Sequence, residues 1–242
     1  MRMPMKTKKR TIWIMAPVLA ISIGFLLPNA TAQSDPYPKM APIDQYLMPD
    51  QGAEIALARS AAPESISRDA EVLILGRHGF ETAVKGKNGF VCIVARSWTS
   101  VPDPDFWNPK VRVPMCLNAP AARSYLLHLT KETEWGLAGR TQAQMTESIT
   151  AAIAKNELPA MESGAMCYML SKQGYAGDST PPSPPHVFYS DTDPAIWGAN
   201  LQGSPVLGVN DTVEHLTSFV VPVQRWSDGA DYREGSVAEH HH

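Results

Sequence analysis

The sequence predicts an α+β fold: a single domain with a mainly antiparallel sheet and a helical hairpin packed on one face. Three observations support this prediction. Short apolar runs rich in β-branched residues come first, two amphipathic helices occupy the middle, and strands return before the C-terminus. Strands and helices do not alternate one for one, as they do in parallel α/β proteins. About 210 residues follow the N-terminal leader, a usual size for one domain.

The first 32 residues have the pattern of a cleavable signal peptide. A basic stretch from Lys6 to Arg10 precedes an uncharged apolar run, Ile12 to Leu27, and Ala30-Thr31-Ala32 offers the small residues of a cleavage site. The run is shorter than the ~20 apolar residues that a spanning helix needs, so an uncleaved anchor is the less favoured alternative. The sequence predicts export to the periplasm or the extracellular space, with no membrane span after cleavage.

Cleavage would make the chain strongly acidic. Residues 1–32 hold five basic and no acidic residues, which leaves 16 Lys and Arg against 24 Asp and Glu, a net charge of −8. Such a charge argues against nucleic acid and anionic membrane surfaces as partners. The expected partner is therefore a small ligand or a component of the cell envelope.

The first half of the chain is predicted to contain one helix and three strands. Residues 33–49 hold four prolines and are expected to form an extended arm before the globular domain, 50–226. Asp50 is the expected N-cap of a helix that stops before Pro63. The predicted strands are Glu71–Leu75, Phe80–Val84 and Phe90–Ala95. Asn88-Gly89 is typical of a type I′ turn, which predicts a hairpin between the last two.

The second half follows a Pro-rich loop, 99–115. One helix is expected from Pro120, and a second from an N-cap at Thr141 with Gln144 completing a capping box. Later strands are predicted at 165–170, 186–189 and 217–223, where Pro222 indicates a sheet edge or a bulge. Residues 227–242 are a polar C-terminal tail that ends in three histidines, which could bind a metal loosely.

Arg77-His78-Gly79 directly follows the first apolar strand and precedes Glu81. The stretch resembles the phosphate-pocket motif of histidine phosphatases. That resemblance implies that His78 is a nucleophile and that Arg77 neutralises phosphate oxygens. The second histidine of that family has no match here, because the residues after His186 and His215 do not fit. The competing interpretation is a turn between two strands, bent at its glycines.

A wider set of motifs covers Gly86 to Val223. NGFVC, PMCLN, MCYM and PPHVFY together resemble a family of exported bacterial proteins with no assigned activity. Three cysteines remain in the mature chain, and by spacing alone any of the three pairings is possible. The resemblance implies a structural disulfide between Cys92 and Cys116, which would leave Cys167 as a free thiol.

Cys167 and His186 are the candidate ligand-binding residues. If their strands pair, they could face one another as a thiolate–imidazole dyad, or as a soft-metal site with a nearby methionine. The alternative is that Cys167 is inert packing. His128 falls opposite the apolar stripe of its helix and is expected at the surface. No H-E-x-x-H, C-x-x-C, G-x-S-x-G or Gly-rich phosphate loop is present, so the sequence predicts neither a metal site nor a cofactor.

Two functional hypotheses follow. The first is a non-catalytic exported protein that binds a small ligand or an envelope partner. The second is a hydrolase that uses His78 with Arg77, Glu81 and His186. An enzyme of the second kind would bring these side chains into one pocket.

Overall fold

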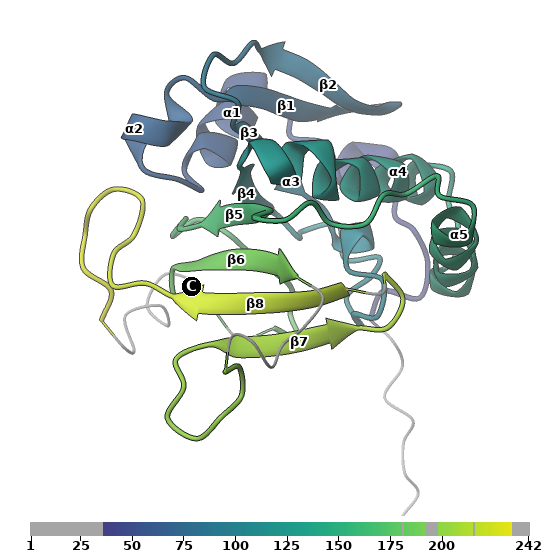
Figure 1. The fold of residues 1–242 in the computed structure, drawn as a ribbon. Coiled ribbons are helices and arrows are strands. Elements are labelled where there is room, and N and C mark those ends of the chain that lie inside the picture. Colours follow the sequence, from purple (N-terminus) through teal and green to yellow (C-terminus); the bar gives the residue numbers. More distant parts are fainter. Residues whose placement is uncertain (1–35, 181, 192–197, 215, 234–242) are drawn as a thin grey trace, which may run out of the picture. The chain divides into compact units, whose positions relative to one another are not determined.

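One eight-stranded sheet runs through the computed structural model, which describes residues 36–180, 182–191, 198–214 and 216–233 (Figure 1). Its strands are β1 (Glu71–Gly76), β2 (Gly79–Val84), β3 (Val91–Ala95), β4 (Val113–Leu117), β5 (Met166–Met169), β6 (His186–Asp191), β7 (Leu207–Asp211) and β8 (Leu216–Pro222). Their order across the sheet is β2-β1-β3-β4-β5-β6-β8-β7, and only β1 and β3 are parallel neighbours. The predicted α+β fold with a mainly antiparallel sheet is confirmed. The predicted signal peptide lies outside the described residues.

Helices cover both faces of the first strands of the sheet. They are α1 (Gln51–Arg59), α2 (Glu64–Ser67), α3 (Ala119–Arg123), α4 (Tyr125–Leu137) and α5 (Gln142–Ala154), with 3₁₀ turns η1 (Ile43–Gln45) and η2 (Ser97–Thr99). Leu57 and Ala58 of α1 pack with Val72 and Cys92 on one face. Leu129 of α4 packs on the opposite face, in a cluster that also holds Ala121, Ile93, Met115 and Leu117.

The helical hairpin forms at the predicted positions. Thr141 caps α5, and its side chain and that of Gln144 make the reciprocal bonds of a capping box. The helix expected from Pro120 is broken at Ser124, whose hydroxyl donates to the Pro120 carbonyl oxygen at 2.8 Å. A serine that bonds back into its own helix competes with the backbone ladder, which accounts for the break between α3 and α4.

The Asn88-Gly89 segment does not join a hairpin, contrary to the prediction. β2 pairs with β1 on the outer side, and the chain then crosses the end of β1 to place β3 parallel on the inner side. Gly86 permits the crossing, because a Cβ there would lie 2.3 Å from the Glu71 backbone nitrogen. The Asn88 side chain instead donates to the Ile66 carbonyl oxygen at 2.8 Å.

Residues 36–49 are packed rather than an extended arm. Tyr46, at the end of η1, has no exposed surface and contacts Trp98, with 4.6 Å between the ring centroids. The buried Arg96 side chain donates from Nε to the Tyr46 carbonyl oxygen and from a terminal nitrogen to Glu54 of α1, each at 2.8 Å. One arginine thus ties this segment and α1 to the end of β3.

Pro222 lies neither at a sheet edge nor at a bulge, contrary to the prediction. It is the last residue of β8, an inner strand, and the ladder with the edge strand β7 stops earlier, at Val220. The absent N–H of Pro222 therefore costs no bond to β7. The first residues of the polar tail are bonded to the segment after β5. Ser227 donates its backbone N–H to the Leu170 carbonyl oxygen at 3.0 Å, and Asp228 pairs with Lys172 at 2.6 Å.

The seam between β4 and β5 is a short ladder, as is the one between β1 and β3. β4 and β5 share two paired positions, Cys116 with Tyr168 and Leu117 with Cys167. Pro114 of β4 has no N–H to offer a ladder on either side. The two strands part beyond this short ladder, and the side chains on either side of the gap line cavities.

Candidate functional site

The Arg77-His78 segment is a two-residue hairpin turn. Gly76 pairs with Gly79 across it, and Gly79 has a φ of 136°, a conformation that glycine adopts most easily. Both side chains of the turn are exposed, and Arg77 pairs with Asp44. Four strand spacings of about 4.8 Å put roughly 19 Å between β1 and the strand of His186. The structure therefore does not bring His78 and His186 together.

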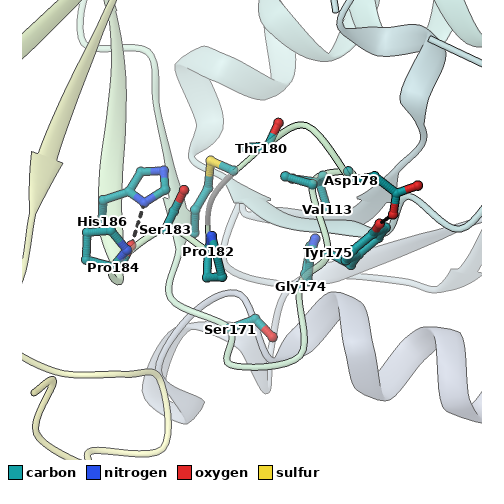
Figure 2. A pocket seen from close by; sticks show the side chains of 14 residues that line it. Val113, Ser171, Gly174, Tyr175, Asp178, Thr180, Pro182, Ser183, Pro184 and His186 are labelled. Carbon is teal, nitrogen blue, oxygen red and sulfur yellow. Dashed lines mark hydrogen bonds between the residues drawn. The ribbon is translucent and has the colours of Figure 1, made fainter. Parts of the chain in front are cut away.

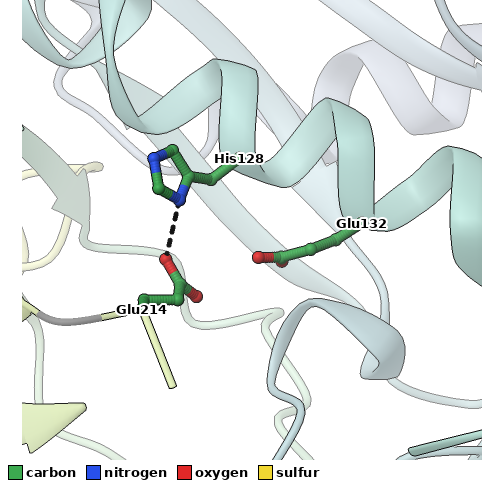
Figure 3. A group of neighbouring side chains, drawn as sticks. All are labelled: His128, Glu132 and Glu214. Atoms are coloured by element: carbon green, nitrogen blue, oxygen red, sulfur yellow. Dashed lines mark ion pairs between the residues drawn. The ribbon is translucent and has the colours of Figure 1, made fainter. Parts of the chain in front are cut away.

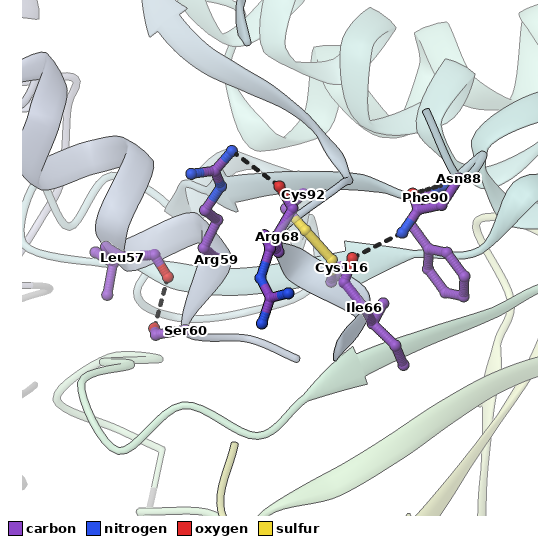
Figure 4. The surroundings of a disulfide bond; sticks show 9 residues. All are labelled: Leu57, Arg59, Ser60, Ile66, Arg68, Asn88, Phe90, Cys92 and Cys116. Carbon is purple, nitrogen blue, oxygen red and sulfur yellow. Dashed lines mark hydrogen bonds between the residues drawn. A yellow bond between two sulfur atoms is a disulfide. The ribbon is translucent and has the colours of Figure 1, made fainter. Parts of the chain in front are cut away.

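Cys92 and Cys116 are joined at disulfide distance (Figure 4). They are directly opposite on β3 and β4, with their Cα atoms 4.0 Å apart. Both have no exposed surface and pack with Leu57 and Ile66 beneath the first two helices. The pairing implied by the family resemblance is confirmed, and its role here is structural.

Cys167 and His186 do not form a dyad. β5 and β6 pair, as the hypothesis required, but Cys167 lies opposite Phe188, and His186 lies opposite Met169. Such diagonal neighbours are about 7–8 Å apart at Cα, beyond hydrogen-bond reach for a short thiol. Cys167 is 1% exposed, and burial raises the pKa of its thiol. It is a packed thiol, as the alternative interpretation held.

His186 lines a cavity of about 340 Å³ at the parting of β4 and β5 (Figure 2). Val113 and Pro114 of β4 and Met169 of β5 form one side of it. The loop that links β5 to β6 forms the other side, and it contributes serine, threonine and proline side chains: Ser171, Thr180, Pro182, Ser183 and Pro184. The lining is a largely apolar surface with a few hydrogen-bonding groups, as in small-molecule sites.

The His186 ring has a defined tautomer. Its Nδ1 lies 2.8 Å from the Pro184 carbonyl oxygen. A carbonyl oxygen can only accept, so Nδ1 carries the proton, and Nε2 is the acceptor of the neutral ring. Burial lowers the pKa of His186, and the bond to Pro184 offsets this only in part. A neutral imidazole with an acceptor nitrogen thus lines the cavity.

Two anchors hold the loop over this cavity. Asp105, 1% exposed, accepts from the Ser179 backbone N–H at 2.7 Å and from the Asn108 amide at 3.0 Å. Asp178 accepts from the hydroxyls of Tyr37 and Tyr175. These bonds lower the pKa of Asp178, and the bond to Asp178 raises the pKa of Tyr37 to about 12. Burial, with the bond to Asp178 as the next cause, raises the pKa of Tyr175 to about 12.

A second cavity, also of about 340 Å³, adjoins the first. The two share four lining residues: Val113, Met169, Ala176 and Thr180. The second continues along the same face of the sheet towards Tyr125 of α4 and Glu214, which lies in the turn between β7 and β8. Arg96 also lines it, but its guanidinium is already bonded to Glu54 and to two backbone carbonyls.

Glu214 belongs to a buried cluster with two residues of α4, His128 and Glu132 (Figure 3). One ligand-type atom from each of the three lies within 4.8 Å of the others. Asp211 positions the turn, because its carboxylate accepts the backbone N–H groups of Val213 and Glu214 at 2.8 and 2.9 Å. The prediction of a surface His128 was wrong: it is 1% exposed, because the Pro159 segment and the β7–β8 turn cover that side of α4.

The sequence interpretation, which predicted no metal site, missed this cluster. Its one available signal was the spacing of His128 and Glu132, four residues apart and so on one side of a helix. Glu214 gives no local signal, because only the turn between β7 and β8 brings it to α4.

Comparison with known proteins adds no relative: no family model, curated protein or solved structure matches this chain. The family resemblance of its motifs accordingly stays a prediction. Within the described residues, no helix has the length and apolar character to cross a membrane.

Proposed function

We propose that this chain is an exported, non-catalytic binding protein that holds a small ligand in the His186 cavity. The observation that carries the proposal is the acceptor nitrogen of a neutral, nearly buried histidine on the wall of a largely apolar cavity. A volume of about 340 Å³ is within the usual range of ligand sites, which begins near 300 Å³. This cavity favours a small ligand over an envelope partner as the principal occupant.

The lining also indicates the chemistry of the ligand. Met169, Pro182 and Pro184 offer contact to a flat or branched apolar group. Since Nε2 of His186 accepts, the ligand needs one O–H or N–H donor beside that group. We infer a small hydroxylated or N–H-bearing ring compound rather than an anion, because no lysine or arginine is among the described residues that line the cavity.

A pair of probes tests this inference. 2-Naphthol carries a ring and one donor, and 2-methoxynaphthalene has the same ring with the donor blocked. We expect 2-naphthol to bind by calorimetry and to shift the NMR signals of the His186 ring. The methyl ether is expected to bind about fivefold more weakly, since one hydrogen bond contributes about 1 kcal/mol.

Two variants complete the experiment. His186→Leu should abolish the difference between the two probes, whereas His78→Ala, in the exposed turn, should leave both affinities unchanged. Failure of 2-naphthol to bind, or equal discrimination by wild type and His186→Leu, would contradict the proposal.

The hydrolase hypothesis has no structural observation in its favour, because the exposed Arg77-His78 turn is four strands away from β6. An aryl phosphate assay is its direct test. We expect the same background rate for wild type and His78→Ala, and a wild-type turnover that disappears in the variant would restore it.

A further inference from the structure

Glu132 is a buried carboxyl group without a hydrogen-bond donor. Its side chain has no exposed surface, and neither oxygen accepts a hydrogen bond from an N–H or from a hydroxyl group of the described residues. Figure 3 shows the carboxyl group directed at the gap between His128 and Glu214. An ionised carboxylate in such a place costs several kcal/mol unless a positive charge accompanies it.

His128 presents a lone pair to the same gap. Its Nε2 lies 2.8 Å from the Pro159 carbonyl oxygen and so carries the proton of the singly protonated ring. Nδ1 then faces Glu214 Oε2 across 3.2 Å, and neither atom has a hydrogen-bond partner of acceptable geometry among the described residues. A ring that donates one N–H to a carbonyl and offers its other nitrogen to a metal is the usual arrangement of a histidine ligand.

With His128 in its neutral form, the three side chains together form a set of acceptors. In the described part of the chain, no lysine or arginine pairs with Glu132 or Glu214. The nearby Arg96 is already bonded to Glu54. When both carboxyl groups are ionised and the imidazole is neutral, the cluster carries a charge of −2, which a single divalent ion neutralises.

We propose that His128, Glu132 and Glu214 bind one divalent transition-metal ion of the zinc class. Imidazole with carboxylates suits zinc and its neighbours, whereas calcium and magnesium prefer oxygen ligands alone. The ligand atoms of the three side chains lie within 4.8 Å of one another. Zinc bonds of about 2.0–2.2 Å bring ligand atoms closer together than this, so binding draws the carboxylates inward by a small side-chain rotation.

The second cavity adjoins the cluster. Glu214 belongs both to the cluster and to the wall of that cavity, and it is the only one of the three proposed ligands among the described residues that line it. Three protein ligands leave a fourth position on zinc for water or another small molecule. This site lies on different residues from the His186 proposal and stands independently of it.

The probe is zinc itself, added to the mature chain, residues 33–242, after treatment with a chelator. His240, His241 and His242 are first replaced by alanine in every variant, because they could bind zinc on their own. We expect one equivalent of zinc by calorimetry and a rise in Tm with zinc but not with calcium or magnesium. Cobalt should give a visible absorption spectrum of nitrogen and oxygen ligands without thiolate.

Glu132→Gln and Glu214→Gln test the ligands. Loss of a residue that merely supports a ligand costs about 10–100-fold in affinity, so loss of a ligand should cost more than about 100-fold. Without zinc, Glu132→Gln should be at least as stable as wild type, because an unpaired buried acid has been removed. That readout separates a lost ligand from a damaged fold.

Glu134→Gln is the matched control, since Glu134 lies on the same helix and pairs only with Lys131 at the surface. It should keep full zinc affinity. A wild-type chain whose Tm does not respond to zinc, or a Glu132→Gln variant that binds zinc as wild type does, would overturn the proposal.

Discussion

A single carbonyl contact fixes the tautomer of each of the two buried histidines among the described residues, His128 and His186. His186 donates from Nδ1 to Pro184, and His128 donates from Nε2 to Pro159, both at 2.8 Å. The nitrogen left over is an acceptor in each case: Nε2 beside an apolar cavity for His186, and Nδ1 facing two carboxyl groups for His128. The same side chain therefore suits a neutral ligand in one place and a cation in the other.

The His186 ring should make stability depend on pH. Its pKa in the folded chain is lower than the ordinary value of about 6.5, so the unfolded chain takes up a proton first as pH falls. The contribution of the neutral ring is fully present above about pH 6.5 and is lost as pH falls through the lower, folded pKa. We expect urea unfolding between pH 8 and pH 5 to show a smaller loss for His186→Gln than for wild type.

His78→Ala serves as the control for that series. His78 is exposed, so its replacement should leave the wild-type pH dependence intact. An NMR titration of the His186 ring that gives a pKa above 6.5 would contradict the expectation.

Among the elements, the ends of η1, α1 and β3 are joined through one buried ion pair. Arg96 and Glu54 are 0% and 2% exposed, and the terminal nitrogen lies 2.8 Å from the carboxylate. The same Glu54 oxygen accepts the Leu75 backbone N–H at 3.2 Å, which adds β1 to the junction. The Arg96 guanidinium is buried, so water does not compete for its bonds to Glu54 and to the Tyr46 carbonyl oxygen. These bonds hold residues 36–49 against the sheet.

Glu54→Gln should lower the free energy of unfolding by about 3–5 kcal/mol, the usual cost of leaving one buried charge uncompensated. Glu64→Gln is the matched control, because Glu64 pairs with Arg68 at the surface and such pairs contribute below about 1 kcal/mol. Urea denaturation of both variants decides the point. Equal losses in the two would show that the Arg96 pair is no stronger than a surface pair.

Local patterns predicted most elements of this fold, and the failures have physical causes. Val91–Ala95 is a strand because five consecutive apolar residues are buried on both faces, which is visible in the sequence. β7 was missed, since Leu207 and Val209 are its only large apolar side chains and both are exposed. The parallel pairing of β1 with β3 was hidden as well, because Asn88-Gly89 suits a hairpin equally well.

Of the two candidate sites, the sequence pointed to a residue of one and missed the other. His186 was singled out from its strand and lines a cavity, but its partnership with Cys167 was wrong, because the register puts Met169 opposite it. The His128 cluster was not foreseen, since burial of that side of α4 depends on segments remote in sequence. Side-chain periodicity shows where a helix is apolar, and it does not show which polar side chain a distant turn will cover.

At the scale of the whole molecule, the ladder of β4 with β5 is a short one within a continuous sheet. β2, β1, β3 and β4 lie on one side of the seam, and β5, β6, β8 and β7 on the other. Both cavities border the seam, where residues of β4 and Met169 face one another across the gap. The disulfide links β3 to β4, and Val113 and Pro114 of β4 form the wall of the first cavity opposite the β5–β6 loop.

Formation of that disulfide should depend on export. Disulfides persist in oxidising compartments and are rare in reducing ones. In a bacterial host, we expect the full precursor to yield a chain that begins at Gln33, with Cys92 and Cys116 linked and Cys167 free. A version without residues 2–32 should stay in the cytosol with all three thiols reduced. It should be less stable by about 3 kcal/mol, because the bridge closes a loop of 24 residues.

Alkylation followed by mass spectrometry reports the state of the three thiols. The double variant Cys92→Ala and Cys116→Ala in the exported chain should show the same loss of stability without a change of compartment. An exported chain that keeps Met1, or a cytosolic chain with the same bridge, would refute the link between leader and disulfide.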